Sequence, residues 1–203
     1  MPMKGKTGKV YQFKITLKGI RPPIWRRIQV PEGYGFWDLH VAIQDSMGWL
    51  DCHLHEFRIV NSKNGFQESI GIPDDDGFSD FEILPGWKKK IKNYFTAGNR
   101  KAEYVYDFGD DWRHTVQLDG IFPVQQDVKY PCCLKGKRKC PPEDCGGEWG
   151  YAEFLEKILD PRHKERKALL KWVGGEFDPE RFEPNDVEFS DPIERFRIAF
   201  LHA

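Results

Sequence analysis

Four of the chain's five cysteines lie within residues 130–147, in the loop-like stretch YPCCLKGKRKCPPEDCGG. A thiol can form a disulfide, bind a metal, attack a substrate or pack as a small apolar side chain. Redox chemistry favours a C-x-x-C pair at a helix start, and this spacing does not occur here. An odd number of cysteines, most of them clustered, in a reducing compartment therefore favours metal binding over a disulfide framework.

The spacing of these cysteines differs from the C-x₂-C of common zinc fingers, because six residues separate Cys133 from Cys140 and four separate Cys140 from Cys145. Zinc accepts any backbone path that brings four ligands into a tetrahedron, so we expect a structural Zn²⁺ on these three thiolates. His55 is the candidate fourth ligand, since an imidazole on an apolar strand face needs a polar partner. His53 and His114 are alternatives. An equally weighted interpretation is that these thiols and imidazoles only pack.

A second set of reactive side chains surrounds a predicted hairpin turn. Asp107, Asp110 and His114 flank the turn, and Glu143 and Asp144 follow in the cysteine-rich stretch. Carboxylates and an imidazole could hold a metal or act as acid and base in a hydrolase. The alternative is structural, because Asp favours turns by accepting hydrogen bonds from nearby backbone amides.

Aromatic and basic residues offer a third type of chemistry, which is binding without catalysis. Trp25 and Trp112 could contact a protein or peptide partner, together with the loop that contains Arg138. Lys88 and Lys89 lie in WKKKIKNYF, and KGKRK follows later, so phosphate contacts and base stacking are the alternative. The formal net charge of −1 gives the whole chain no general attraction to nucleic acid.

The hydropathy pattern contains no apolar run long enough to span a bilayer, and the basic N-terminus leads directly into a strand pattern. We therefore expect a soluble, cytoplasmic protein with no membrane partner.

Hydrophobic periodicity indicates the elements that position these residues. Residues 10–19 and 24–30 alternate as strands, and Phe36, Leu39, Ile43 and Met47 follow the spacing of one helix face ending at Gly48. A strand at 53–60 and a hairpin over 102–121 follow, with helices at 150–159, at 161–173 and from 192 onward. This order predicts an α+β fold, with an antiparallel or mixed sheet crossed by a helix in a β-grasp-like way. We expect a core domain over residues 1–160 and a helical segment, 161–203, packed on it.

Five motifs in order resemble the plasmid pRiA4b ORF-3-like family: YQFKITLKGIRPPIWRRIQVP, FWDLHVAIQDSMGW, HLHEF, YVYDFGDDWRHTV and CLKGKRKCPPEDCGGEWGYAEFLE. They span most of residues 10–160. The resemblance implies a single α+β domain without an established activity, in a family whose members carry labels such as resolvase or repressor-linked protein. We therefore expect a recognition module with a structural zinc. The alternatives are a nucleic-acid-binding protein of mobile-element context and a metal-dependent hydrolase.

Overall fold

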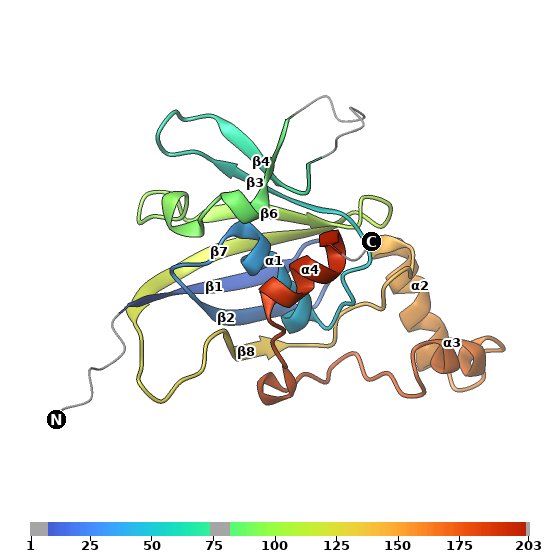
Figure 1. Cartoon of the computed structure of the whole chain (residues 1–203). Coiled ribbons are helices and arrows are strands. Elements are labelled where there is room, and N and C mark those ends of the chain that lie inside the picture. The colour runs from blue at the N-terminus through green and yellow to red at the C-terminus, as the bar shows by residue number, and fades with distance from the viewer. Residues whose placement is uncertain (1–7, 74–81, 202–203) are drawn as a thin grey trace.

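The alternating N-terminal segment forms β1 (Lys9–Leu17), which pairs antiparallel with β2 (Trp25–Pro31). This structure is a computed structural model that describes residues 8–73 and 82–201 (Figure 1). Beyond β1 and β2, its sheet contains β3 (His55–Val60), β4 (Gln67–Gly71), β5 (Ile83–Pro85), β6 (Lys101–Tyr106), β7 (Trp112–Pro123) and β8 (Cys132–Lys137). The strand order is β5-β4-β3-β6-β7-β1-β2-β8, and β4 and β5 form a parallel pair in an otherwise antiparallel sheet. The expected α+β class with a mixed sheet is confirmed, and β1, β2, α1 and β3 follow the predicted opening order.

The helices are α1 (Phe36–Met47), α2 (Gly147–Leu159), α3 (Arg166–Trp172) and α4 (Pro192–Leu201). Short 3₁₀ turns occupy η1 (Gly86–Lys88), η2 (Ile91–Asn93) and η3 (Pro184–Asp186). α1 ends where predicted, because Gly48 adopts a left-handed conformation with φ of 84° that glycine tolerates without steric cost. No helix within the described residues has the length and apolar character needed to cross a bilayer.

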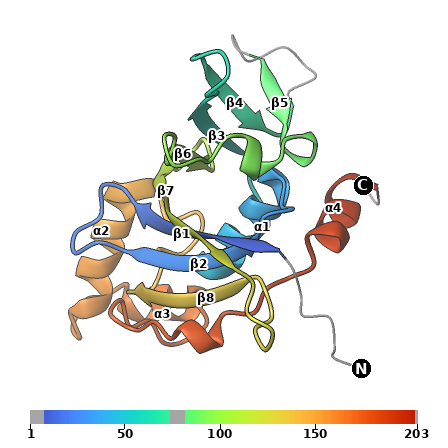
Figure 2. The same ribbon diagram turned by 90° about the vertical axis from the view of Figure 1, so that its left-hand side faces the viewer.

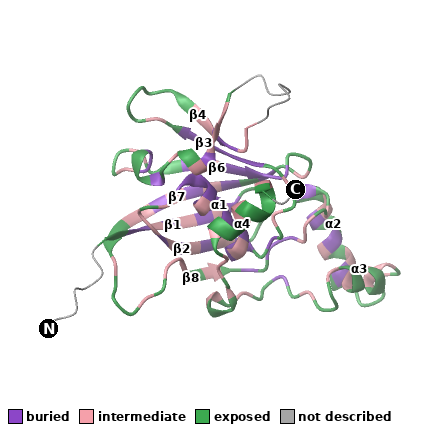
Figure 3. Ribbon diagram, in the orientation of Figure 1, coloured by how far each residue is buried: buried purple, intermediate pink, exposed green. Residues whose placement is uncertain are grey.

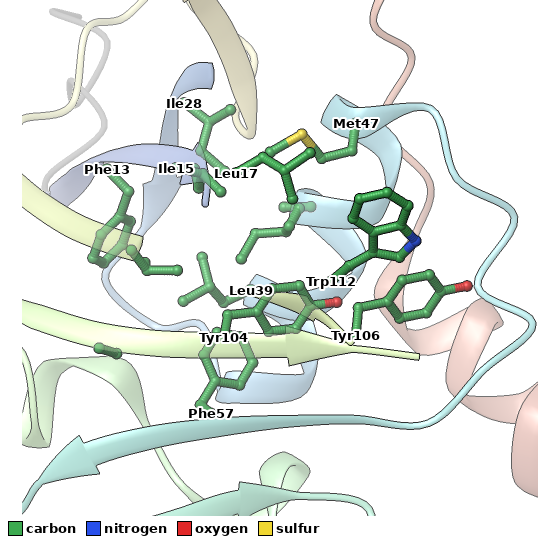
Figure 4. Close-up of a cluster of buried hydrophobic side chains, with 14 of the residues drawn as sticks. Phe13, Ile15, Leu17, Ile28, Leu39, Met47, Phe57, Tyr104, Tyr106 and Trp112 are labelled. Atoms are coloured by element: carbon green, nitrogen blue, oxygen red, sulfur yellow. The ribbon is translucent and has the colours of Figure 1, made fainter. Parts of the chain in front are cut away.

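The core forms where α1 lies against the sheet. Phe13, Ile15 and Leu17 of β1 point toward Leu39 and Met47 of α1, and Tyr104 and Trp112 extend the cluster along β6 and β7 (Figure 4). α1 is buried on nearly all sides, because α4 packs on it away from the sheet (Figures 1 and 3). The Trp37 ring contacts the rings of Phe196 and Phe200, with centroids 5.7 and 5.4 Å apart.

The opposite face of the sheet carries polar side chains, and some of their charges are paired. Arg27 of β2 contacts Asp119 of β7 at 2.7 Å, and Lys18 contacts Glu103 of β6 at 2.6 Å. Lys14 lies over the Trp25 ring, 5.1 Å from its centroid.

The structure contains β4 and β5 where no strand was expected, and it differs from the expected elements at two further places. β8 lies inside the loop-like stretch as an edge strand, since pairing with β2 supplies hydrogen bonds that its sequence pattern does not indicate. α3 begins at Arg166 instead of Pro161, because Asp160 accepts hydrogen bonds from the amides of Arg162 and His163 and so stabilises a turn there. α3 packs on α2, while the division at residue 160 stays a prediction.

Candidate functional site

The four side chains predicted to bind zinc are not gathered in the structure. Cys140 is buried with its Sγ 3.4 Å from the Met47 sulfur, whereas Cys133 lies on β8 and Cys145 lies just before α2. Within the described ranges, the groups of three or more potential ligands contain no cysteine. Burial raises the pKa of Cys133 to about 11 and those of Cys140 and Cys145 to about 12, so these thiols stay protonated in the metal-free protein.

His55 lies instead in a buried polar network beneath α4. Its ring stacks on that of His40 with centroids 3.4 Å apart and an interplanar angle of 5°. His40 Nε2 lies 2.7 Å from Asp51 Oδ1, and its Nδ1 lies 2.8 Å from the Tyr104 hydroxyl. Gln44 donates a second hydrogen bond to that hydroxyl.

This network is a poor metal site even though His40, Asp51 and His55 are close. An ion shared by two parallel rings would lie about 1.7 Å out of each ring plane, far from the in-plane lone pair that binds metal at about 2.0–2.1 Å. Both nitrogens of His40 already have partners. Burial and the adjacent His40 hold the pKa of His55 well below its ordinary value, so His55 stays neutral.

Asp51 links the network to α4. Burial tends to raise the pKa of Asp51, but the hydrogen bond and charge of His40 and the Arg195 guanidinium, 3.2 Å away, outweigh it and lower that pKa. Sequence reasoning missed His40 and Asp51, because only the path of the loop after α1 brings them together.

The predicted catalytic set is partly assembled. Asp107 follows β6, and Asp144 lies in the loop before α2. The His53 ring lies between their two carboxylates. Asp110 accepts a hydrogen bond from the Gly146 amide. It therefore links the turn between β6 and β7 to the loop before α2, and its carboxylate does not face His53. The placement of His114 in this set was wrong, because its ring is fully buried on the core-facing side of β7 and its Nδ1 lies 3.4 Å from the Tyr104 carbonyl. Burial lowers the pKa of His114 to about 4.

Glu143 holds these loops together. Its Oε1 accepts a 2.5 Å hydrogen bond from the Tyr106 hydroxyl, and its Oε2 accepts one from the Leu50 amide at 2.9 Å. The same tyrosine hydroxyl accepts a bond from the Cys52 amide. Both carboxylate oxygens of Glu143 are therefore used, so it positions loops and is not a free base. The turn between β6 and β7 lies beside the start of α2 (Figure 1).

The residues predicted to contact a partner are only partly accessible. The expectation for Trp112 was wrong, because the side chain is 1% exposed and forms part of the core. Arg138 is also buried, and it donates hydrogen bonds to Glu180 and to the Pro22 carbonyl. Trp25 is half-buried against Lys14 and Arg27, whereas Lys88 is exposed and Lys89 is half-buried beyond β5.

A groove opens beside β8, between residues 129–133 and residues 184–192, and we call it the β8 groove. Figure 2 shows the segment after α3 running along β8. The groove has a volume of about 770 Å³, and an adjoining hollow of about 530 Å³ shares Lys129 and Tyr130 with it. Its apolar wall comes from Tyr34, Tyr130, Val187 and Phe189, and Cys132 and Cys133 complete that wall.

The β8 groove also has acidic lining residues. Glu188 and Asp191 line it, and Asp38 and Asp45 lie behind Tyr34. Burial first, and then the negative charges of Asp38, Asp191 and Asp45, raise the pKa of Tyr34. Lys129 is the one cation among the groove-lining residues that the structure describes. The sequence carried no signal for this groove, because its two walls lie more than fifty residues apart.

A mixed eight-stranded sheet with a buried crossing helix and a helical C-terminal part defines the class of this α+β protein. A crystal structure of a protein of unknown function, MM3350 from Methanosarcina mazei Go1, has the same fold with a TM-score of 0.83. It is 49% identical, and the match covers 92% of this chain and 100% of that one. An uncharacterized protein, y4hQ of Sinorhizobium fredii (strain NBRC 101917 / NGR234), is 36% identical over 165 residues, 81% of each chain. The chain belongs to the plasmid pRiA4b ORF-3-like protein family, whose model matches residues 9–186.

Proposed function

We propose that this protein is a cytoplasmic binding module that holds an extended peptide with a lysine or arginine side chain in the β8 groove. The observation that carries the proposal is a ligand-sized groove lined by apolar and aromatic residues and by two carboxylates, with one lysine among its described lining residues. Tyrosine faces attract a cationic side chain, and the carboxylates of Glu188 and Asp191 complement its charge. The five free cysteines are consistent with a reducing compartment.

The same charges disfavour nucleic acid as the ligand of this groove, since carboxylates repel phosphates. The aromatic residues of WKKKIKNYF also have internal roles. Tyr94 and Phe95 are buried, and Trp87 packs on Phe196 and Phe200 of α4. These three rings are thus not free to stack on bases, which weakens the case for nucleic-acid binding through WKKKIKNYF.

Fluorescence anisotropy with labelled peptide pools tests the proposal. One pool of octapeptides has arginine at a fixed central position, and the matched pool has glutamate there. We expect binding of the arginine pool, and we expect the double variant E188Q/D191N to weaken it about fivefold through the loss of two partly exposed charges. The side-chain oxygen of the asparagine in D191N still accepts the hydrogen bond from the Ile193 amide at the start of α4, so the fold is retained.

The control variant is E183Q, because Glu183 lies on the same segment but outside the groove lining. It is expected to bind the arginine pool as tightly as the wild type. Equal binding of the two pools, or an unchanged affinity in E188Q/D191N, would contradict the proposal. Tight, salt-dependent binding of labelled oligo(dT) with no peptide binding would favour the nucleic-acid alternative.

A further inference from the structure

We propose that His53, Asp107 and Asp144 form a binding site for one divalent transition-metal ion, with Zn²⁺ as the probe. The three residues come from separate segments: the loop before β3, the end of β6 and the loop before α2. His53 Nε2 lies 3.0 Å from Asp144 Oδ1 and 3.6 Å from Asp107 Oδ2, and the three ligand atoms all lie within 4.8 Å of one another. The site is separate from the β8 groove and does not depend on the peptide proposal.

The contacts of His53 point to a missing partner. Its Nε2 atom is fully shielded, yet neither carboxylate contact has the geometry of a hydrogen bond. Asp107 and Asp144 also have no lysine or arginine within 4.0 Å among the residues that the structure describes. Two facing carboxylates without a cation, beside an unpartnered imidazole nitrogen, are an arrangement that a bound dication would neutralise and satisfy.

The distances suit a tetrahedral ion. With metal–ligand bonds of about 2.0–2.2 Å, tetrahedral ligand atoms lie about 3.3–3.6 Å apart, close to the observed 3.0 and 3.6 Å. One imidazole and two carboxylates favour a first-row dication over Mg²⁺, which prefers oxygen ligands in octahedral geometry. Three protein ligands leave a coordination position for water or a small ligand.

Neighbouring contacts already orient the ligands. Asp107 Oδ1 accepts a 2.9 Å hydrogen bond from the Gly109 amide, and this leaves Asp107 Oδ2 directed at His53. Glu143, one residue before Asp144, is fixed by Tyr106 and by the Leu50 amide. Outer contacts of this kind fix ligand orientation in metal sites. The Gly147 Cα packs closely on the Asp110 carbonyl, where a Cβ would come within 2.6 Å, so the loop before α2 is held against the turn.

Isothermal titration of the full chain with Zn²⁺ tests the site, using protein purified without a metal-affinity tag and stripped with chelator. We expect one Zn²⁺ per chain, with affinity reduced at least about tenfold in each of H53A, D107N and D144N. Asn is close to Asp in size and tolerates the left-handed conformation that Asp107 and Asp144 adopt, with φ of 57°. The two Asn variants should therefore fold, and their metal-free melting temperatures check this.

Two controls separate this site from other ligands. D111N changes a carboxylate of the same turn that pairs with Arg113, and it should bind Zn²⁺ like the wild type. C133S/C140S should also leave binding unchanged, and a Co²⁺-loaded sample should show no thiolate-to-metal charge-transfer band. The proposal fails if the wild type does not bind Zn²⁺, if D107N and D144N bind as tightly as the wild type, or if only the cysteine variant loses binding.

Discussion

Tyr104 is the residue on which the buried polar network depends. Its hydroxyl accepts a hydrogen bond from Gln44 Nε2 and contacts His40 Nδ1, each at 2.8 Å. Tyr104→Phe leaves two buried polar groups without this partner, so we expect the free energy of unfolding to fall by about 1–3 kcal/mol. Urea denaturation measures the change.

Tyr151→Phe is the matched control for this prediction. Tyr151 is buried on α2, and its hydroxyl has no hydrogen-bond partner among the residues that the structure describes. Removing that hydroxyl relieves an unsatisfied group, so the free energy of unfolding should stay the same or rise slightly. A similar loss in both variants would mean that the Tyr104 network contributes nothing specific to stability.

Single residues also show how much of the proposed metal site could be predicted from the sequence. Residue type and turn chemistry pointed to Asp107 and Asp144, but they gave the imidazole of the set as His114. The alternation of WRHTVQL carried the correcting signal, since it places His114 on the buried face with Trp112 and Val116. The pairing of His53 with Asp144 could not be predicted, because it depends on how two loops cross the end of the sheet.

At the scale of elements, α4 is the helix whose attachment can be tested separately. It contacts α1, the loop after α1 and η1 through a few groups: the Trp37 indole N–H donates to the Pro192 carbonyl, Arg195 pairs with Asp51, and Phe196 packs on Trp37 and Trp87. Phe196→Ala removes the aromatic part of this contact. We expect faster amide hydrogen exchange over residues 192–201, equivalent to a local loss of about 1–2 kcal/mol, with little change in the central strands.

Ile198→Ala is the comparison on the same helix, because Ile198 is 66% exposed. It should leave exchange in α4 nearly unchanged. If Phe196→Ala instead accelerated exchange throughout the sheet, α4 would be part of the cooperative core and not a separately opening element.

The elements that could be predicted are those whose burial pattern is local. β1, β2 and α1 each place apolar side chains on one face at a regular spacing, so periodicity alone located them. β8 could not be found this way, because only its hydrogen bonds with β2 make CCLKGK a strand. The sequence also could not show that His40 and Gln44 are buried on a helix predicted to have one apolar face, because their shared partner, the Tyr104 hydroxyl, comes from β6, sixty residues further along the chain.

At the scale of the whole molecule, buried histidines make stability depend on pH. His55 and His114 are fully buried, and burial lowers the pKa of His55 well below its ordinary value and that of His114 to about 4. The unfolded chain binds a proton on each near pH 6.5, whereas the folded chain keeps both neutral. Stability is therefore highest above about pH 7 and falls as the pH decreases toward 4, with His114 contributing a loss of about 2 kcal/mol between pH 7 and pH 5.

Urea denaturation at pH 7 and at pH 5 checks this expectation, and His114→Gln isolates one of the two contributions. The variant is expected to be less stable at both pH values, because it repacks a buried site, but its stability should fall less between them. Asp38 and Asp45 act in the opposite direction, since burial raises their pKa values and the folded state binds protons more readily near pH 4. They therefore offset part of the loss that the histidines cause, in the pH range where these carboxylates titrate. An equal fall in the wild type and in His114→Gln would show that His114 is not held neutral by the fold.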